Sequence, residues 1–164
     1  MITPYITFYG ECKEALEFYQ KVFHCETKIS QSYEDYIPED IEIIPPNLNE
    51  WILHAELEIC GTVIWFADEV SKQVVKGNNI KLVVTTETKI EAEKIFERLN
   101  NEAYITLPPT ETFYSSFHAG ITDRYGVILF HKDKLPFIEK LQSIKSKTEE
   151  EIKYVDMFKM WKRV

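Results

Sequence analysis

The fold is decided by one stretch near the N-terminus, residues 3–23, which reads TPYITFYGECKEALEFYQKVF. Its first part is rich in strand formers, and Gly10 then permits a turn because a residue without a Cβ adopts left-handed backbone conformations at little cost. Apolar residues after the turn recur at the i, i+3, i+4, i+7 spacing of one helix face: Cys12, Ala15, Leu16, Tyr19, Val22 and Phe23. The stretch therefore predicts a strand at 5–8 followed by an amphipathic helix at 11–23.

The rest of the chain continues with strand and helix signals. Runs of β-branched and aromatic residues bounded by turn residues predict strands at 27–33, 51–59, 62–67, 80–85, 104–107 and 127–132. Thr88 and Glu91 form a capping box that predicts the start of a second helix. Prolines predict a long loop over 36–49, and the Pro-Pro pair at 108–109 predicts a turn that leads into an aromatic loop. Asp123 takes the first position of a turn that ends at Gly126, so we expect it to be structural.

The two strand–helix units are related by an internal repeat. After a shift of about 77 residues the apolar helix faces coincide, namely Ala15 with Ala92, Phe18 with Ile95, Tyr19 with Phe96 and Val22 with Leu99. The sequence thus predicts the order β-α-β-β-β twice, in an α+β fold whose curved mixed sheets surround a cavity. We assign residues 1–133 to this domain, with modules at about 1–70 and 78–133. Residues 134–164 carry further apolar stripes at helical spacing and predict a C-terminal helical extension.

Length and charge limit the functional classes. A chain of 164 residues has the usual size of one domain. The net charge of −8 argues against nucleic-acid binding, because phosphates require a basic surface. No apolar run approaches the roughly 18 residues of a membrane-spanning helix, and the first residues lack the basic and apolar regions of a signal peptide. We therefore expect a cytoplasmic protein that contacts neither nucleic acid nor a membrane.

Three segments resemble one protein family and follow the order found in that family. They are PYITFYGECKEALEFYQKVF at 4–23, HAELEICGTVIWFAD at 54–68 and GITDRYGVILF at 120–130. Together they resemble PhnB-like proteins of the vicinal oxygen chelate superfamily, which includes glyoxalase I, bleomycin-resistance proteins and extradiol dioxygenases. The resemblance implies paired βαβββ modules, a homodimer and a site inside each curved sheet. Some relatives carry the name demethylubiquinone methyltransferase, but this sequence has no glycine-rich loop for a methyl-donor cofactor.

Metal-using members of the superfamily place one ligand on each of four strands. The resemblance implies that these positions fall at Pro4, Trp65, Lys81 and Phe130 in this chain. A slip of the alignment by one residue does not supply histidine or carboxylate at even two positions. We therefore expect the inherited metal site to be absent and no other cofactor to be bound.

The histidines leave one alternative open. His54 and Glu56 are two residues apart on a predicted strand and share a face, so that with His118 they could form a facial triad for iron or zinc. That arrangement would make the protein a metal-dependent lyase or dioxygenase. His24 and His131 lie at the ends of predicted elements, and we expect both at the surface.

Aromatic and histidine side chains form the candidate ligand site. If the modules surround the implied cavity, the predicted lining is Phe8, His54, Trp65, Phe113, Tyr114, Phe117, His118 and Phe130. An apolar wall with a few polar groups is typical of a small-molecule pocket. The sequence therefore predicts metal-free binding of a small organic molecule, of the glyoxalase/bleomycin-resistance type. The same side chains could instead simply fill the core, and the sequence assigns no catalytic residue.

Overall fold

The computed structural model describes residues 2–37, 39, 44–70, 74–112 and 114–133. Phe113 and the predicted C-terminal helices lie outside these residues. The first module contains β1 (Tyr5–Phe8), α1 (Cys12–Phe23), β2 (Thr27–Ser32), a short 3-10 helix (Leu48–Glu50), β3 (Ile52–Ile59) and β4 (Thr62–Asp68). The second contains β5 (Leu82–Thr86), α2 (Lys89–Leu99), β6 (Tyr104–Thr112), β7 (Ser115–Thr122) and β8 (Ile128–Asp133). The predicted order β-α-β-β-β, twice, is confirmed.

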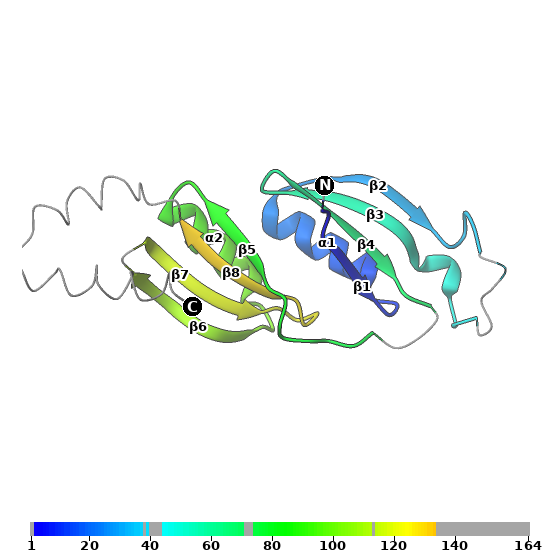
Figure 1. The fold of residues 1–164 in the computed structure, drawn as a ribbon. Coiled ribbons are helices and arrows are strands. Elements are labelled where there is room, and N and C mark those ends of the chain that lie inside the picture. Colours follow the sequence, from blue (N-terminus) through cyan, green and yellow to red (C-terminus); the bar gives the residue numbers. More distant parts are fainter. Residues whose placement is uncertain (1, 38, 40–43, 71–73, 113, 134–164) are drawn as a thin grey trace, which may run out of the picture.

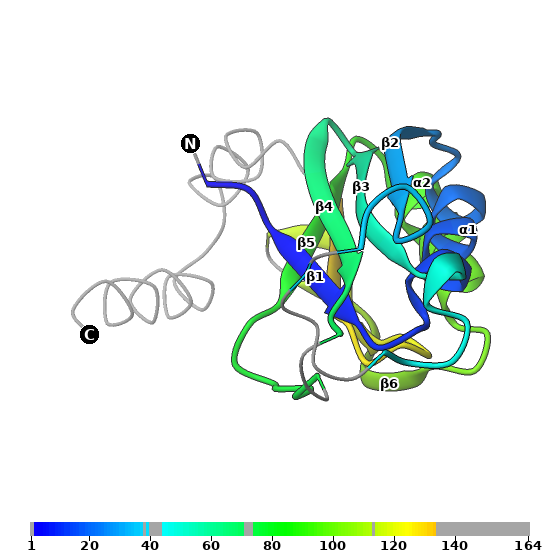
Figure 2. The same cartoon turned by 90° about the vertical axis from the view of Figure 1, so that its right-hand side faces the viewer.

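Each module is built on a mixed four-stranded sheet. The strand orders are β1-β4-β3-β2 and β5-β8-β7-β6, and in each sheet the first strand of the module runs parallel to the fourth. The two helices lie on the same side of the sheets (Figures 1 and 2). Among the residues that the structure describes, each sheet therefore has one face covered by a helix and one open face. Within the described residues no helix is long and apolar enough to cross a bilayer.

The helices bury the faces that their sequence periodicity predicts. In α1 the buried residues are Cys12, Ala15, Leu16, Tyr19 and Val22, and in α2 they are Ala92, Ile95, Phe96 and Leu99. The hydroxyl of Thr88 accepts a hydrogen bond from the backbone N–H of Glu91 at 3.2 Å, which confirms the predicted helix cap. The shift of 77 residues is thus correct for the helices, because Ala15, Tyr19 and Val22 match three buried residues of α2.

The predicted turn at the Pro-Pro pair is wrong. Strand β6 runs through Pro108 and Pro109 without ending. Proline lacks the N–H that a central strand would donate, but β6 lies at the edge of its sheet, where only one side of the strand is paired. Its pairing with β7 shifts between Leu107 and Thr110, which marks an irregularity at the prolines.

A buried aspartate ends the fourth strand of each module. Asp68 Oδ2 accepts a hydrogen bond from Ile52 N at 2.9 Å, and Asp133 Oδ1 accepts one from Ser116 N at 2.8 Å. Burial raises the pKa of Asp68, and hydrogen bonds from the backbone act against that rise. Burial acts in the same direction on Asp133, but hydrogen bonds from the hydroxyls of Ser115 and Ser116 and from the backbone hold its pKa below the usual value. Through these hydrogen bonds Asp68 connects β4 to β3, and Asp133 connects β8 to β7.

Each module has its own hydrophobic core, and each core includes a residue of the other module, Tyr125 in the first and Val22 in the second. Tyr19 of α1 donates a hydrogen bond to Asp123 Oδ2, between β7 and β8, at 2.6 Å. The other oxygen of Asp123 accepts from the backbone N–H groups of Tyr125 and Val127, as expected of a structural turn residue. The Tyr125 ring lies 5.9 Å from the ring of Phe8, inside the core of the first module.

We expect Tyr19→Phe to lower the free energy of unfolding by about 2 kcal/mol, because a hydrogen bond to a buried carboxylate is lost and its acceptor is left unpaired. Burial already raises the pKa of Asp123, so the carboxylate needs this donor. Urea unfolding at pH 7, followed by circular dichroism, measures the difference. Tyr104→Phe, at a largely exposed tyrosine, is the control. Equal stabilities of the two variants would contradict the assigned role of Tyr19.

Candidate ligand-binding site

The open faces of the two sheets carry most of the predicted site residues. Along β4 the residues Ile64 and Phe66 are buried beneath α1, and Trp65 between them is 39% exposed on the other face. Along β8 the alternate residues Leu129 and His131 are buried, and Phe130 points to the open side. His54 and His118 lie on the open faces of β3 and β7, and Tyr114 precedes β7.

Two predicted lining residues belong to the core instead. Phe8 is 3% exposed and stacks on Phe66, with ring centroids 6.4 Å apart. Phe117 is 5% exposed and packs edge-on against Phe96 of α2 at 5.8 Å. The sequence prediction placed Phe117 in a loop, but it belongs to β7, where strand alternation turns it toward the helix. Phe8 and Phe117 are therefore core residues and do not line the predicted ligand site.

In the first module the open face presents a histidine between an indole and a carboxylate. The His54 and Trp65 rings meet edge to face at 5.1 Å, and Tyr5 approaches Trp65 in the same manner at 6.1 Å. Glu56 Oε1 lies 3.4 Å from His54 Nε2. The aromatic rings offer a stacking surface, and the His54–Glu56 pair offers a polar contact beside it.

The second module repeats this arrangement with different neighbours. The His118 ring lies 5.7 Å from Phe130 and 5.3 Å from Tyr114. The ammonium of Lys81 lies 4.9 Å from the centroid of Phe130, a cation–π contact. A surface of aromatic rings and histidine thus occurs on both sheets.

The two histidines occupy equivalent positions of the repeat. Trp65 pairs across the sheet with Glu56, and Phe130 pairs with Gly120. His54 and His118 each stand two residues before these partners. The sequence carries a signal for this match, because a His-Ala pair occurs within both strands, at 54–55 and 118–119. The shift of about 77 residues that aligns the helices does not align these histidines. The later strands of the two modules align after a shift of 64 or 65 residues.

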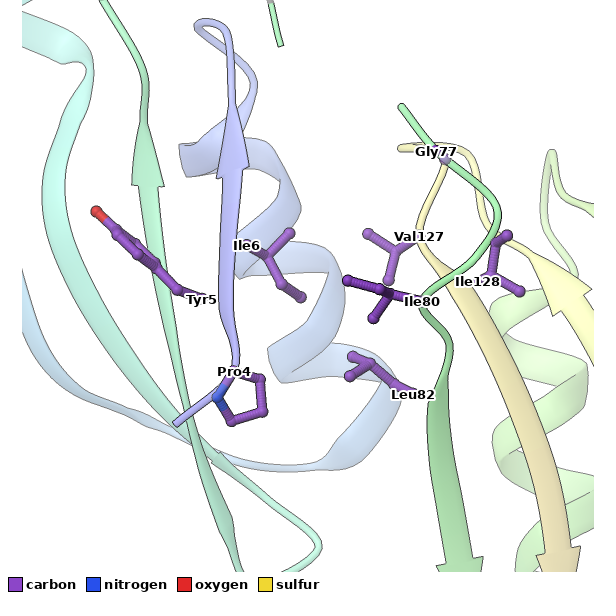
Figure 3. Close-up of a pocket in the computed structure, with 9 residues that line it drawn as sticks. Pro4, Tyr5, Ile6, Gly77, Ile80, Leu82, Val127 and Ile128 are labelled. Carbon is purple, nitrogen blue, oxygen red and sulfur yellow. The ribbon is translucent and has the colours of Figure 1, made fainter. Parts of the chain in front are cut away.

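A pocket of about 260 Å³ lies at the seam between the modules (Figure 3). Its lining residues come from β1, from β5 with the segment before it, and from the chain entering β8: Pro4, Tyr5, Ile6, Gly77, Ile80, Leu82, Gly126, Val127 and Ile128. The side chains of Ile6, Ile80, Leu82 and Val127 converge, whereas Tyr5 turns away from them. Sequence reasoning did not identify this pocket, because its walls meet only when the modules pack together.

The described residues do not fit the metal site of the superfamily. No group of three or more His, Cys, Asp or Glu among them lies close enough to hold an ion. His54 and Glu56 are neighbours on β3, but His118 lies on the other sheet, so the alternative triad is not assembled in this part of the chain. At the implied ligand positions, the side chains of Trp65 and Phe130 have no lone pair available to bind a metal ion. The ammonium of Lys81 lies over the ring of Phe130.

Two βαβββ modules, each built on a mixed four-stranded sheet, form a glyoxalase-like fold. The fold is similar to that of a glyoxalase/bleomycin resistance protein/dioxygenase family enzyme from Burkholderia phytofirmans PsJN. The TM-score is 0.54 at 17% identity, over 80% of this chain and 97% of that one. Residues 1–130 match the family described as 3-demethylubiquinone-9 3-methyltransferase, and the chain belongs to this PhnB-like family.

Two relatives cover nearly the same part of the chain. The protein YjdN of Escherichia coli K12 is 24% identical over 132 residues, which are 77% of this chain and 90% of YjdN. A PhnB protein from Bacillus cereus is 23% identical and has a TM-score of 0.64 over 80% of this chain and 98% of its own. At this level of identity the structural likeness establishes the fold, and the reaction or ligand has to be argued from the site.

Proposed function

We propose that the protein binds a small organic molecule on the open faces of its two sheets and holds it without a metal ion. The observation that supports this function is the repeated pairing of a histidine with an aromatic ring, His54 with Trp65 and His118 with Phe130. Partly exposed rings beside polar groups suit recognition of a planar ligand. Tyr5 lines the apolar seam pocket and also contacts Trp65, so the pocket adjoins the first pair.

The proposal includes a homodimer in the cytoplasm, as the family resemblance implies. It does not include methyl transfer, although the description of the family names that reaction. The sequence contains five scattered glycines and no glycine-rich loop to hold a methyl-donor cofactor. Native mass spectrometry of the full chain tests the dimer, and a monomer at micromolar concentration would contradict it.

We expect planar aromatic compounds from a metabolite and antibiotic panel to quench tryptophan fluorescence and raise the melting temperature. Trp65→Ala and Phe130→Ala should each weaken binding about tenfold, since stacking on a lost ring is worth roughly 1 kcal/mol or more. Ile90→Ala is the matched control, because it removes an exposed apolar side chain from α2. Absence of binding by the whole panel below millimolar concentration would contradict the proposed function.

Metal analysis of the purified protein separates this proposal from the alternative enzyme. We expect no stoichiometric zinc, iron or nickel. A full equivalent of one of these metals that disappears in the His54→Ala variant would contradict metal-free binding. It would instead support a lyase or dioxygenase.

A further inference from the structure

The two open faces differ in charge at equivalent positions. Across from Trp65 the first module carries Glu56, whereas across from Phe130 the second carries Gly120. Next to the buried aspartate that ends the fourth strand, the first module has Ala67 and the second has Lys132. At these two positions the first module therefore carries a carboxylate and no cation, and the second carries an ammonium group and no carboxylate.

Cationic groups surround Phe130 on the open face of the second module. Lys81 lies over the ring of Phe130, and Lys132 is the cross-strand neighbour of His118. Strands β5, β7 and β8 contain one carboxylate, Asp133, which is 5% exposed on the opposite face, and the edge strand β6 adds the exposed Glu111. Asp133 is already hydrogen-bonded to Ser115 and Ser116, so it does not neutralise the open face. In a chain with a net charge of −8, strands β5, β7 and β8 together with the adjoining Lys81 thus carry two lysines near Phe130 and no exposed carboxylate.

His118 has an unused hydrogen-bonding atom at this place. Its Nδ1 is buried and has no hydrogen-bond partner among the described residues. Buried polar atoms of side chains generally have a partner, and an exception calls for an explanation such as a ligand or ordered water. Because the protein covers this nitrogen, a bound group reaches it only if the His118 ring turns.

Gly120 leaves room for the aromatic ring beside this cluster. A Cβ at position 120 would lie 2.7 Å from Thr106 Oγ1 and 3.2 Å from Phe130 Cζ. The space that a side chain would fill is thus occupied by Thr106, Leu107 and Phe130. The absence of a side chain at 120 lets the ring lie against the sheet, where it can serve as a flat platform.

We propose that the open face of the second module is a binding site for a small aromatic carboxylic acid. The ring of the ligand stacks on Phe130 and Tyr114, and its carboxylate lies among Lys81, Lys132 and His118. Charge-assisted hydrogen bonds to a carboxylate are about twice as strong as neutral ones, so the anionic group adds affinity to the stacking. This inference rests on the proposed function and specifies the chemical class of the ligand.

Three probes separate the contributions of ring and charge: benzoate has both, benzamide has the ring without the charge, and acetate has the charge without the ring. Titration of the ¹⁵N-labelled full chain should give an affinity for benzoate about tenfold higher than for either of the others. The shifted amide signals should include those of His118, Phe130 and Lys132. Lys81→Met and Lys132→Met should each weaken benzoate binding about threefold to fivefold and leave benzamide binding unchanged. Lys89→Met, on α2, should affect neither.

The outcomes distinguish this inference from the proposed function. Equal affinities for benzoate and benzamide, or lysine variants that bind benzoate like the original chain, would overturn the anion site. Benzamide binding on the open faces would then still support the proposed function. Shifts confined to other regions, or no binding of any probe, would overturn both. The dispersion of the amide spectrum shows directly that each variant is folded.

Discussion

Asp68→Ala is expected to lower the free energy of unfolding by about 3 to 4 kcal/mol, since each buried N–H left without an acceptor costs roughly 1–3 kcal/mol. Asp68 is 3% exposed, and its two oxygens accept hydrogen bonds from Cys12 N at the start of α1 and from Ile52 N at the start of β3. Removing the carboxylate leaves both donors unpaired in the core. Urea unfolding followed by circular dichroism at pH 7 measures the loss.

Two further variants show whether the loss comes from the buried acceptors. Asp68→Asn keeps one oxygen and should recover part of the lost stability. Asp35→Ala removes a carboxylate that accepts a hydrogen bond from Ser32 N at the exposed surface, so it should cost less than about 1 kcal/mol. If Asp68→Ala were no more destabilising than Asp35→Ala, the proposed role of Asp68 as the buried acceptor for α1 and β3 would be contradicted.

His131→Phe is expected to stabilise the protein, and more so in mild acid. His131 is 0% exposed, and neither ring nitrogen has a hydrogen-bond partner among the described residues. Its ring meets Phe96 edge-on at 5.8 Å, and its cross-strand partners are Ala119 and Val84. Phe66 fills the equivalent position in the first module. At pH 7 the substitution should add about 1–2 kcal/mol by removing unpaired polar atoms.

The pH dependence follows from the pKa of His131, which burial lowers to about 4. An unfolded histidine titrates near pH 6.5, so between pH 6.5 and about 4 the unfolded chain takes up a proton that the folded chain does not. The contribution of this residue to stability is therefore complete above pH 6.5 and is lost as the pH falls, by about 3 kcal/mol at pH 4.

The difference between His131→Phe and the original chain isolates this contribution from that of the carboxylates. Guanidinium unfolding at pH 7, 6, 5 and 4.5 should give a stability difference that grows steadily as the pH falls. Phe66→His, the reverse exchange in the first module, should create a similar loss in acid. A difference that stays constant with pH would contradict a buried neutral His131.

The sequence was most informative where one element buries one face. The spacing of Cys12, Ala15 and Tyr19 requires nothing beyond the helix itself, and the buried face of α1 is as predicted. The His131 prediction was wrong because a position near the end of a strand was taken as exposed. The internal repeat does indicate that His131 is buried. With the shift of 65 residues that aligns the later strands, His131 corresponds to Phe66, a core residue.

The candidate site was predictable only in part, for a related reason. The open-face positions of His54, Trp65 and Phe130 follow from strand alternation, which is a local property. Phe117 was misplaced because proline at an edge strand was taken as a break. The seam pocket depends on how two modules pack, and no periodicity within either module reports that contact.

The contact of Tyr125 with the first module also bears on how the chain reaches its fold. Phe8 lies near the start of the chain, and its packing partner Tyr125 lies more than a hundred residues later. During synthesis the first module is complete in sequence long before this partner emerges. Its core therefore lacks one of its aromatic side chains until the second module has been made. We expect the earlier half, although it shares its architecture with the later one, to gain its full stability only after most of the later one has been synthesised.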